Sequence, residues 1–148
     1  MFRGLFEHSI DEKGRLSIPA KFRENIVESG DSTIIVTIFD QCLAAYTLEE
    51  WKILEAKLAN LEQLNPKVRA FQRYFISGAQ ECQLDKAGRI LISASQREFA
   101  GLKKDCFIVG QLSKFEIWSD ERWNTVFKEI SSQFESLASA VSDLGMNL

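Results

Sequence analysis

The chain has 148 residues, of which 45% are hydrophobic and 26% are charged, and its formal net charge is −3. This composition is typical of a soluble globular protein and excludes a disordered or collagen-like chain. Its apolar runs are far shorter than the ~20 residues that cross a bilayer, and no apolar signal core follows Met1. The spacing of the three cysteines fits neither paired disulfides nor a zinc site. We therefore expect a cytoplasmic protein with no membrane span, metal or cofactor.

The first half of the chain predicts two pairs of strands, each followed by a helix. In chain order these elements are strands at Leu5–Ile10 and Arg15–Ile18, a helix at Ala20–Val27, strands at Thr33–Phe39 and Cys42–Tyr46, and a helix at Leu48–Leu61. Asp11 and Gly14 suit a tight turn, since Asp accepts hydrogen bonds from the backbone two residues on and Gly adopts positive φ. Pro19 suits the first turn of one helix, and Thr47 with Glu50 forms a capping box for the next. The apolar face of that next helix contains Trp51, Leu54, Leu58 and Leu61.

An internal repeat explains this organisation. The segment Asp11–Arg15 recurs as Asp85–Arg89 at an offset of 74 residues, with Asp, Gly and Arg in identical places. The segment Tyr46–Trp51 is matched by Trp118–Trp123 at an offset of 72. Two matches in the same order indicate a tandem duplication of a unit of about 70 residues. The second unit then predicts strands near Gln80–Leu84, Arg89–Ile92, Cys106–Gly110 and Phe115–Trp118.

A connecting helix separates the two units. Asn65 and Pro66 provide its N-cap and first-turn proline, and Gly78 ends it. Arg69 and Arg73 lie one turn apart on one face. The residues expected to face inward are Val68, Phe71 and Phe75. The chain thus divides into a first repeat at 1–64, the connecting helix at 65–77 and a second repeat with a C-terminal helix at 78–148.

The C-terminal helix, which is expected to begin at Ser119, has a long apolar stripe. Large apolar residues alternate in steps of four and three over three heptads, which is more than one repeat needs for its own core. The stripe consists of Trp123, Phe127, Ile130, Phe134, Leu137, Val141 and Leu144. Two interpretations remain open: the helix packs on its own barrel, or the stripe is a contact between subunits.

The charges are unevenly distributed along the chain. Residues 63–77 have a net charge of +3 and residues 78–104 of +2, whereas residues 119–148 have a net charge of −3. A weakly acidic chain can therefore present a basic face, although the charges could also be scattered over the surface. Basic residues flank the glycine of each repeated turn: Lys13 and Arg15 in the first, Lys86 and Arg89 in the second. Each of these basic turns is called here a tip. A tip can enter a DNA groove, where Arg pairs with guanine edges or phosphates. The alternative is a salt bridge from Asp11 to Arg15 that only holds the turn.

The sequence gives little support for catalysis. His8 is the only histidine, and neither a nucleophile motif nor a phosphate-binding glycine loop is present. Asp11 and Asp85 are related by the repeat and could form a carboxylate pair. However, each has an arginine four residues on as an ion-pair partner, which favours a turn cap. We expect no enzyme, and an enzyme that uses these two aspartates is the weakest of the alternatives.

The residues Met1–Gly4, His8 and Asp11–Arg23 resemble the amino terminus of the bacterial MraZ family, and Asp85–Arg89 resembles that family's second Asp-x-x-x-Arg motif. The resemblance implies an α+β fold of two tandem swapped-hairpin repeats, related to AbrB-type transcription factors, which form one pseudo-twofold β-barrel flanked by helices. It further implies a ring-shaped homo-oligomer that binds DNA and controls the division and cell-wall genes with which it is encoded. The second repeat departs from the first where Ser93–Ser95 replaces Pro19–Lys21 and Ala87 replaces Lys13. We therefore expect weaker DNA binding at the second tip.

Together these observations predict a nucleoid-associated regulator that binds short direct repeats in its own promoter and represses it. The alternative is a ring-forming interaction or assembly protein whose Asp-x-x-x-Arg turns are structural. The expected DNA contacts are Arg15, Arg89, Lys13, Lys86 and Arg3, with Arg15 as the principal one. The residues expected to shape the turns are Asp11, Gly14, Asp85 and Gly88. The expected subunit contacts are Trp123, Phe127, Ile130, Phe134 and Leu137.

Overall fold

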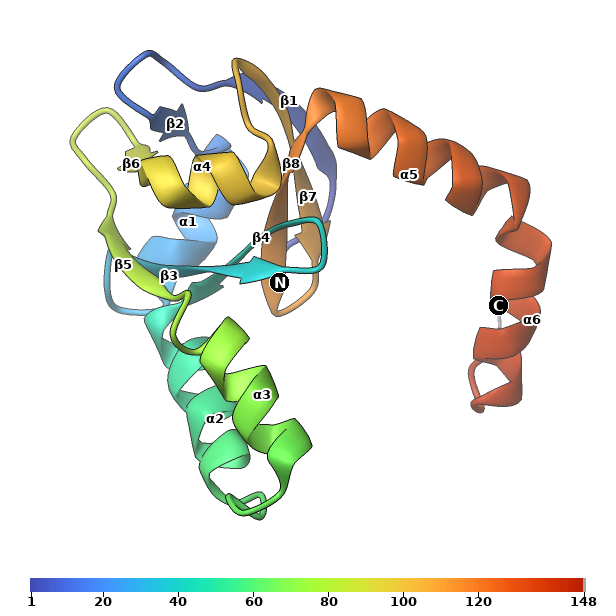
Figure 1. Cartoon of the computed structure of the whole chain (residues 1–148). Helices are drawn as coiled ribbons and strands as arrows, with labels where there is room; N and C mark the ends of the chain where they lie inside the picture. The colour runs from blue at the N-terminus through green and yellow to red at the C-terminus, as the bar shows by residue number, and fades with distance from the viewer. Residues whose placement is uncertain (148) are drawn as a thin grey trace.

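The structure, a computed structural model, describes residues 1–147. Within them the first repeat forms β1 (Leu5–Ser9), β2 (Arg15–Ser17), α1 (Ala20–Glu28), β3 (Thr33–Phe39), β4 (Cys42–Thr47), α2 (Leu48–Ala59) and α3 (Pro66–Phe75). The second repeat forms β5 (Gln80–Gln83), β6 (Arg89–Leu91), α4 (Ala94–Ala100), β7 (Asp105–Gln111), β8 (Lys114–Ser119), α5 (Asp120–Ser132) and α6 (Phe134–Asp143). With the connecting helix α3 counted in the first repeat, both repeats contain the same elements in the same order, and the α+β class is confirmed (Figure 1).

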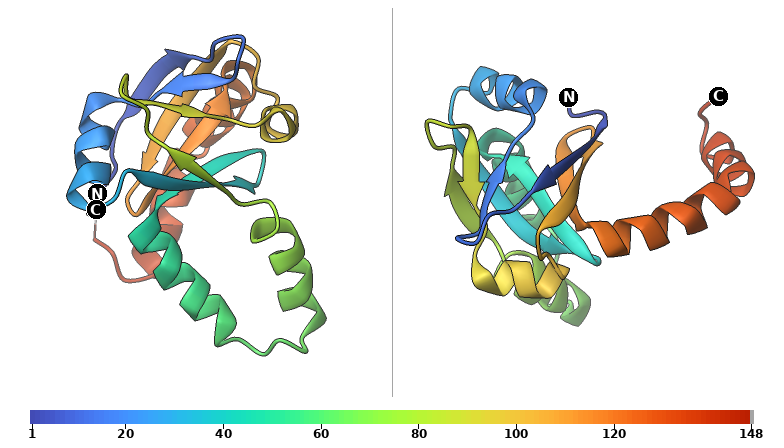
Figure 2. Two further views of the ribbon diagram at one scale, coloured as in Figure 1. Left: turned by 90° about the vertical axis from the view of Figure 1, so that its left-hand side faces the viewer. Right: turned by 90° about the horizontal axis from the view of Figure 1, so that it is seen from above.

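The strands of the two repeats are interleaved in one antiparallel sheet. Its order is β1-β7-β8-β4-β3-β5, so that β1, β4 and β3 of the first repeat pair with β7, β8 and β5 of the second. The remaining strands, β2 and β6, pair with each other in a separate two-stranded ribbon, called here the β2–β6 ribbon. Every strand therefore has a partner in the other repeat, and the order of the sheet is symmetric about the β8–β4 pair. Figure 2 shows how closely the two repeats are interwoven.

The sheet does not close into the expected barrel. Its edge strands β1 and β5 do not pair, and the β2–β6 ribbon makes isolated contacts with both of them. On the β1 side, Ile10 bridges to Leu16, and His8 Nδ1 donates a hydrogen bond of 2.7 Å to the Ser17 carbonyl. On the β5 side, the Cys82 thiol donates to the Leu91 carbonyl at 3.5 Å. The ribbon strands have three residues each, and they lie between the two edge strands and meet them through these isolated contacts.

The main core lies between the sheet, the β2–β6 ribbon and helix α1. Leu16 and Ile90 are opposite each other in the ribbon, and both are buried in this core. Phe22 of α1 packs against three aromatic rings, with ring centroids 5.0 Å from Phe2, 5.2 Å from Phe6 and 5.3 Å from Phe115. Because side chains alternate along a strand, burial of one face of the ribbon turns the other face outward.

Helices α2 and α3 form a hairpin that projects from the sheet (Figure 1). The predicted cap is confirmed, since Thr47 Oγ1 accepts a hydrogen bond of 3.2 Å from the Glu50 amide. Helix α2 ends at Ala59, two residues before the predicted end. Leu61 therefore lies outside the helix and not on its apolar face, and it is half-exposed. Phe71, which was predicted to face inward, lies with its ring 5.1 Å from that of Phe75 on the side of α2, but it remains 43% exposed, whereas Phe75 is buried. Phe75 lies at the end of α3 that meets the sheet, and Phe71 lies one turn further out on the hairpin.

The predicted C-terminal helix is in fact two helices. Gln133 has φ −115° and ψ 10° and separates α5 from α6, which runs in a different direction (Figure 1). Just before the break, the Ser132 hydroxyl donates to the Glu129 carbonyl at 2.8 Å, and such local side-chain bonds compete with the helical backbone pattern. Trp123 packs on the sheet, with its ring 5.8 Å from that of Trp118. The stripe residues from Phe127 to Leu144 are exposed, so the chain's own sheet leaves most of the stripe uncovered.

Candidate nucleic-acid interface

The β1–β2 loop is built around the Asp11 carboxylate. Asp11 Oδ1 accepts hydrogen bonds from the Lys13 amide at 3.0 Å and the Arg15 amide at 2.9 Å, while Oδ2 accepts from Arg15 Nε at 2.6 Å. The Gly14 amide donates to the Asp11 carbonyl at 3.0 Å and closes the turn. The expected turn and the alternative salt bridge are thus present together. The salt bridge engages one edge of the guanidinium, because Nε is the Arg15 side-chain atom that is bonded.

The β5–β6 loop repeats this geometry. Asp85 Oδ1 accepts from the Ala87 and Arg89 amides, each at 2.9 Å, and Oδ2 accepts from Arg89 Nε at 3.0 Å. The Gly88 amide donates to the Asp85 carbonyl at 3.0 Å. Among the described residues, these two Asp–Arg pairs are the only salt bridges within 4.0 Å. In both arginines, the Nη groups make no hydrogen bond to the described part of the chain.

The hydrogen bonds of the loops keep both carboxylates ionised. The Arg15 amide, foremost, holds the pKa of Asp11 below its usual value, and the Arg15 guanidinium adds to this effect. The Arg89 amide and guanidinium lower the pKa of Asp85 in the same order. Neither aspartate is therefore suited to hold a proton near neutral pH, as a general acid must. Their arrangement favours a structural role in the turn over a catalytic pair.

Gly14 has no room for a side chain. Its φ is +89°, and a Cβ added there would lie 2.6 Å from the Ile92 carbonyl oxygen and 2.7 Å from Arg97 Nη1. The Gly14 carbonyl accepts a hydrogen bond of 2.8 Å from the Ile92 amide, and the Gly88 carbonyl accepts one of 3.0 Å from the Ile18 amide. Each loop is therefore fixed to the strand end of the other repeat.

The register of the β2–β6 ribbon places both motif arginines on its outer face. Arg15 is opposite Leu91 and Arg89 is opposite Ser17, with the buried Leu16–Ile90 pair between them. Residues that are opposite in an antiparallel pair, and residues two apart in a strand, point to the same side. Arg15, Ser17, Arg89 and Leu91 thus share the face that turns away from the core. The Arg15 and Arg89 side chains are 36% and 33% exposed, and Leu91 is 59% exposed.

The other residues expected to contact DNA are not all near this face. Lys13 and Lys86 are exposed in the two loops, which lie at opposite ends of the ribbon because β2 and β6 are antiparallel (Figure 2). Arg3 is exposed at the opposite end of β1 from the loop, where its backbone lies beside Gly110. The structure therefore brings Arg15, Arg89 and the two lysines to one region and leaves Arg3 outside it.

Two arginines near the loops were not singled out by the sequence pattern. Arg23 of α1 lies against Gly88, and Arg97 of α4 lies against Gly14. The offset of 74 residues that relates the two motifs also relates these two positions. This shared offset is the signal that could have identified them.

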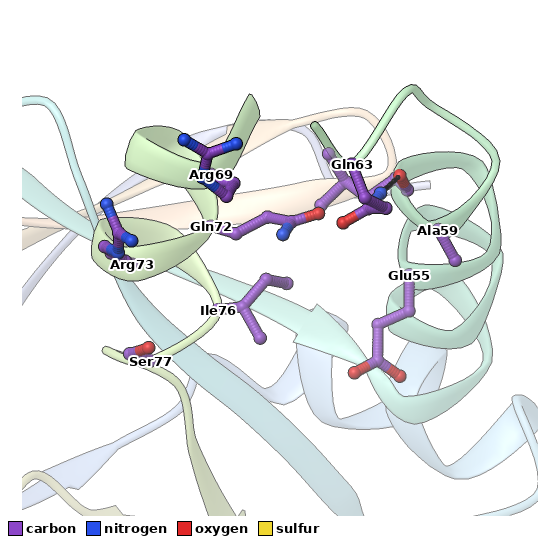
Figure 3. Close-up of a pocket in the computed structure, with 9 residues that line it drawn as sticks. Glu55, Ala59, Gln63, Arg69, Gln72, Arg73, Ile76 and Ser77 are labelled. Atoms are coloured by element: carbon purple, nitrogen blue, oxygen red, sulfur yellow. Dashed lines mark hydrogen bonds between the residues drawn. The ribbon is translucent and has the colours of Figure 1, made fainter. Parts of the chain in front are cut away.

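A cleft of about 670 Å³ lies between α2 and α3, in the hairpin that projects from the sheet. Figure 3 shows Gln72 reaching from α3 toward α2, while Arg69 and Arg73 lie on the α3 side without reaching across. Glu55 lines the opposite wall. Over residues 1–147 no cluster of His, Cys, Asp or Glu has the geometry of a metal site. Within the same range no helix has the length and hydropathy of a membrane span.

Comparison with known proteins identifies the family. The family model described as "MraZ protein, putative antitoxin-like" matches residues 1–74 and again residues 75–144. A protein named "Transcriptional regulator MraZ" from Natranaerobius thermophilus is 43% identical over 143 residues, which cover 97% of this chain and 98% of that protein. Proteins of the same name from Ligilactobacillus salivarius and Thermoanaerobacter sp. are 46% and 45% identical over 146 residues, covering 99% of this chain and all of each relative. The chain therefore belongs to the MraZ family, with one copy of the family's repeat in each half.

Proposed function

We propose that this protein is a transcriptional regulator that binds specific DNA sequences through the outer face of the β2–β6 ribbon. The observation that carries the proposal is the pair Arg15 and Arg89, which share the exposed face of a two-stranded antiparallel ribbon. The major groove of B-DNA admits such a ribbon. The name of the relatives agrees with this role, and a protein that binds chromosomal DNA is expected at the nucleoid.

The Asp–Arg pairs prepare each guanidinium for base recognition. In both pairs the carboxylate bonds Nε, which leaves the two Nη groups free to donate to O6 and N7 of a guanine. A fixed guanidinium loses less conformational entropy on binding than a free one. We assign the aspartates a positioning role, the arginines the base contacts, and Lys13 and Lys86 contacts to phosphates. At the position of Lys13 the second loop has the uncharged Ala87, and on this basis we expect the first tip to bind DNA more strongly.

A second observation favours subunit contact through the C-terminal helices. Phe134 is 64% exposed, and the stripe of which it is part lies in a segment with a net charge of −3. The exposed Phe71 lies in the oppositely charged 63–77 segment, which has a net charge of +3. We propose that the stripe packs against another copy of the chain. Contact between two different surfaces closes a ring when the rotation fits. Such a ring would present many tips to short repeats in DNA.

Footprinting of the purified protein on the DNA upstream of its own coding region tests this function. We expect protection of short repeated elements, with an affinity that falls steeply as salt rises, because bound phosphates release counterions. Autorepression predicts lower expression from this promoter when the protein is present. Uniform weak binding confined to low salt would instead favour the alternative that the protein is a ring-forming interaction protein whose turns are only structural.

A further inference from the structure

Each DNA-facing loop is contacted by an arginine from the helix of the other repeat. Arg23, the fourth residue of α1, donates from Nη1 to the Ala87 carbonyl at 3.4 Å, and its guanidinium lies over Gly88. Arg97, the fourth residue of α4, has its guanidinium over Gly14. Figure 2 shows in its right-hand view that α1 lies beside the β5–β6 loop and α4 beside the β1–β2 loop. The contacts are crossed between the repeats.

The two glycines make these contacts possible. A Cβ at Gly88 would collide with the Arg23 guanidinium, and one at Gly14 would lie 2.7 Å from Arg97 Nη1. The planar guanidinium can therefore lie directly against the loop backbone, which a compact ammonium group cannot do in the same way. Each glycine immediately precedes a motif arginine, Arg15 or Arg89. A shift of the glycine backbone consequently changes the direction of the arginine side chain.

We propose that Arg97 positions the Arg15 tip and that Arg23 positions the Arg89 tip, so that each repeat holds the reading residue of the other. This inference rests on the proposed function. The crossed backbone bonds, Ile92 amide to Gly14 carbonyl and Ile18 amide to Gly88 carbonyl, anchor the loops at their bases. The two arginines contact the same two glycines through their side chains, and within the described residues neither forms a salt bridge that would commit its guanidinium elsewhere. Base recognition requires that the arginine be held to within fractions of an ångström. Each contact of Arg97 or Arg23 with the opposite loop is called here a clamp, and loss of a clamp should weaken sequence-specific recognition.

Double-mutant cycles on the full-length protein test this crossed arrangement. We expect Arg97→Ala to reduce the affinity for operator DNA. In a protein that already carries Arg15→Ala, the same substitution should reduce the affinity by less than about twofold more, because the side chain that Arg97 positions is gone. Combined with Arg89→Ala, the same substitution should retain its full effect. The slope of log affinity against log salt should stay that of the wild type, since no phosphate contact is removed. Arg97→Lys should not restore specificity. As a control, Arg73→Ala on α3 removes the same charge far from the ribbon and should change neither quantity on DNA with a single operator repeat, where contacts between subunits do not contribute.

Hydrogen exchange on the DNA-free protein tests the clamp independently of function. We expect Arg97→Ala to speed exchange of the Gly14 and Arg15 amides several-fold and to leave the Gly88 and Arg89 amides unchanged, with the opposite pattern for Arg23→Ala. Unchanged loop exchange would overturn the proposal even if DNA binding is specific. It would also be overturned if Arg97→Ala lowered the salt slope by about 0.9 and Arg97→Lys restored it, because that result identifies a direct phosphate contact. Faster loop exchange in a protein without sequence preference would support the clamp and refute the proposed function.

Discussion

Replacing Arg15 by alanine should separate DNA recognition from folding. In the described structure the side chain makes one bond, from Nε to Asp11, and it is 36% exposed. The Asp11 carboxylate keeps its bonds to the Lys13 and Arg15 backbone amides in the variant, because these do not involve the side chain of residue 15. We therefore expect the loop and the melting temperature to remain close to those of the wild type.

The effect on DNA binding follows from the two free Nη groups. A bidentate contact to guanine contributes roughly 1–3 kcal/mol of discrimination. Because about 1.4 kcal/mol corresponds to a factor of ten, Arg15→Ala should lower affinity for a single operator repeat by about 5- to 150-fold. A single repeat is the right substrate, since several tips on several repeats would multiply the loss. Fluorescence anisotropy at one fixed salt concentration measures this change.

Two variants complete the comparison. Arg15→Lys keeps the charge and loses the planar fork, so it should retain affinity for random DNA and lose the preference for the operator. Arg89→Ala should act in the same direction as Arg15→Ala but more mildly. Suppose instead that Arg15→Ala lowers the melting temperature sharply and reduces DNA affinity only in proportion to the folded fraction. The pairing with Asp11 would then be structural, and the assignment of Arg15 to base readout would be wrong.

Three further predictions concern stability and assembly. Phe22→Ala should lower the free energy of unfolding by about 3–5 kcal/mol in chemical denaturation, because the buried ring contacts three others; a loss below 1 kcal/mol would contradict this packing. Removal of residues from Ser131 onward should lower the mass of the oligomer in light scattering and weaken binding to multi-repeat DNA more than binding to a single repeat. If the truncated protein keeps its full oligomeric mass and affinity, the removed residues do not form a contact between subunits. Because the pKa values of Asp11 and Asp85 are lowered in the folded state, their stabilising effect is present above pH ~4 and is lost as pH falls through the folded values. In the double variant Asp11→Asn/Asp85→Asn, the free energy of unfolding should accordingly fall less steeply as the pH is lowered than in the wild type. The same pH dependence in both proteins would refute this link between the two carboxylates and stability.

The sequence by itself determined the repeat, the α+β class and the construction of the tips. These features depend on interactions between residues close in the chain. Asp11 reaches amides two and four residues on, and Thr47 caps a helix that starts at the next residue. Such bonds form wherever the chain turns, so residue type and spacing are enough to predict them. The motif arginines were found in the same way, because the repeat marked both.

The tertiary structure alone decided how the two repeats combine. The pairing of β1 with β7 joins residues about a hundred positions apart, and its register depends on which faces become buried together. The same non-local burial put the Leu16–Ile90 pair inward and so placed Arg15 and Arg89 on one outer face. The contacts of Arg23 and Arg97, the break at Gln133 and the exposure of the stripe likewise depend on neighbours from distant parts of the chain. Local patterns specify what a segment can form, but the partner that it meets is set by how the whole core closes.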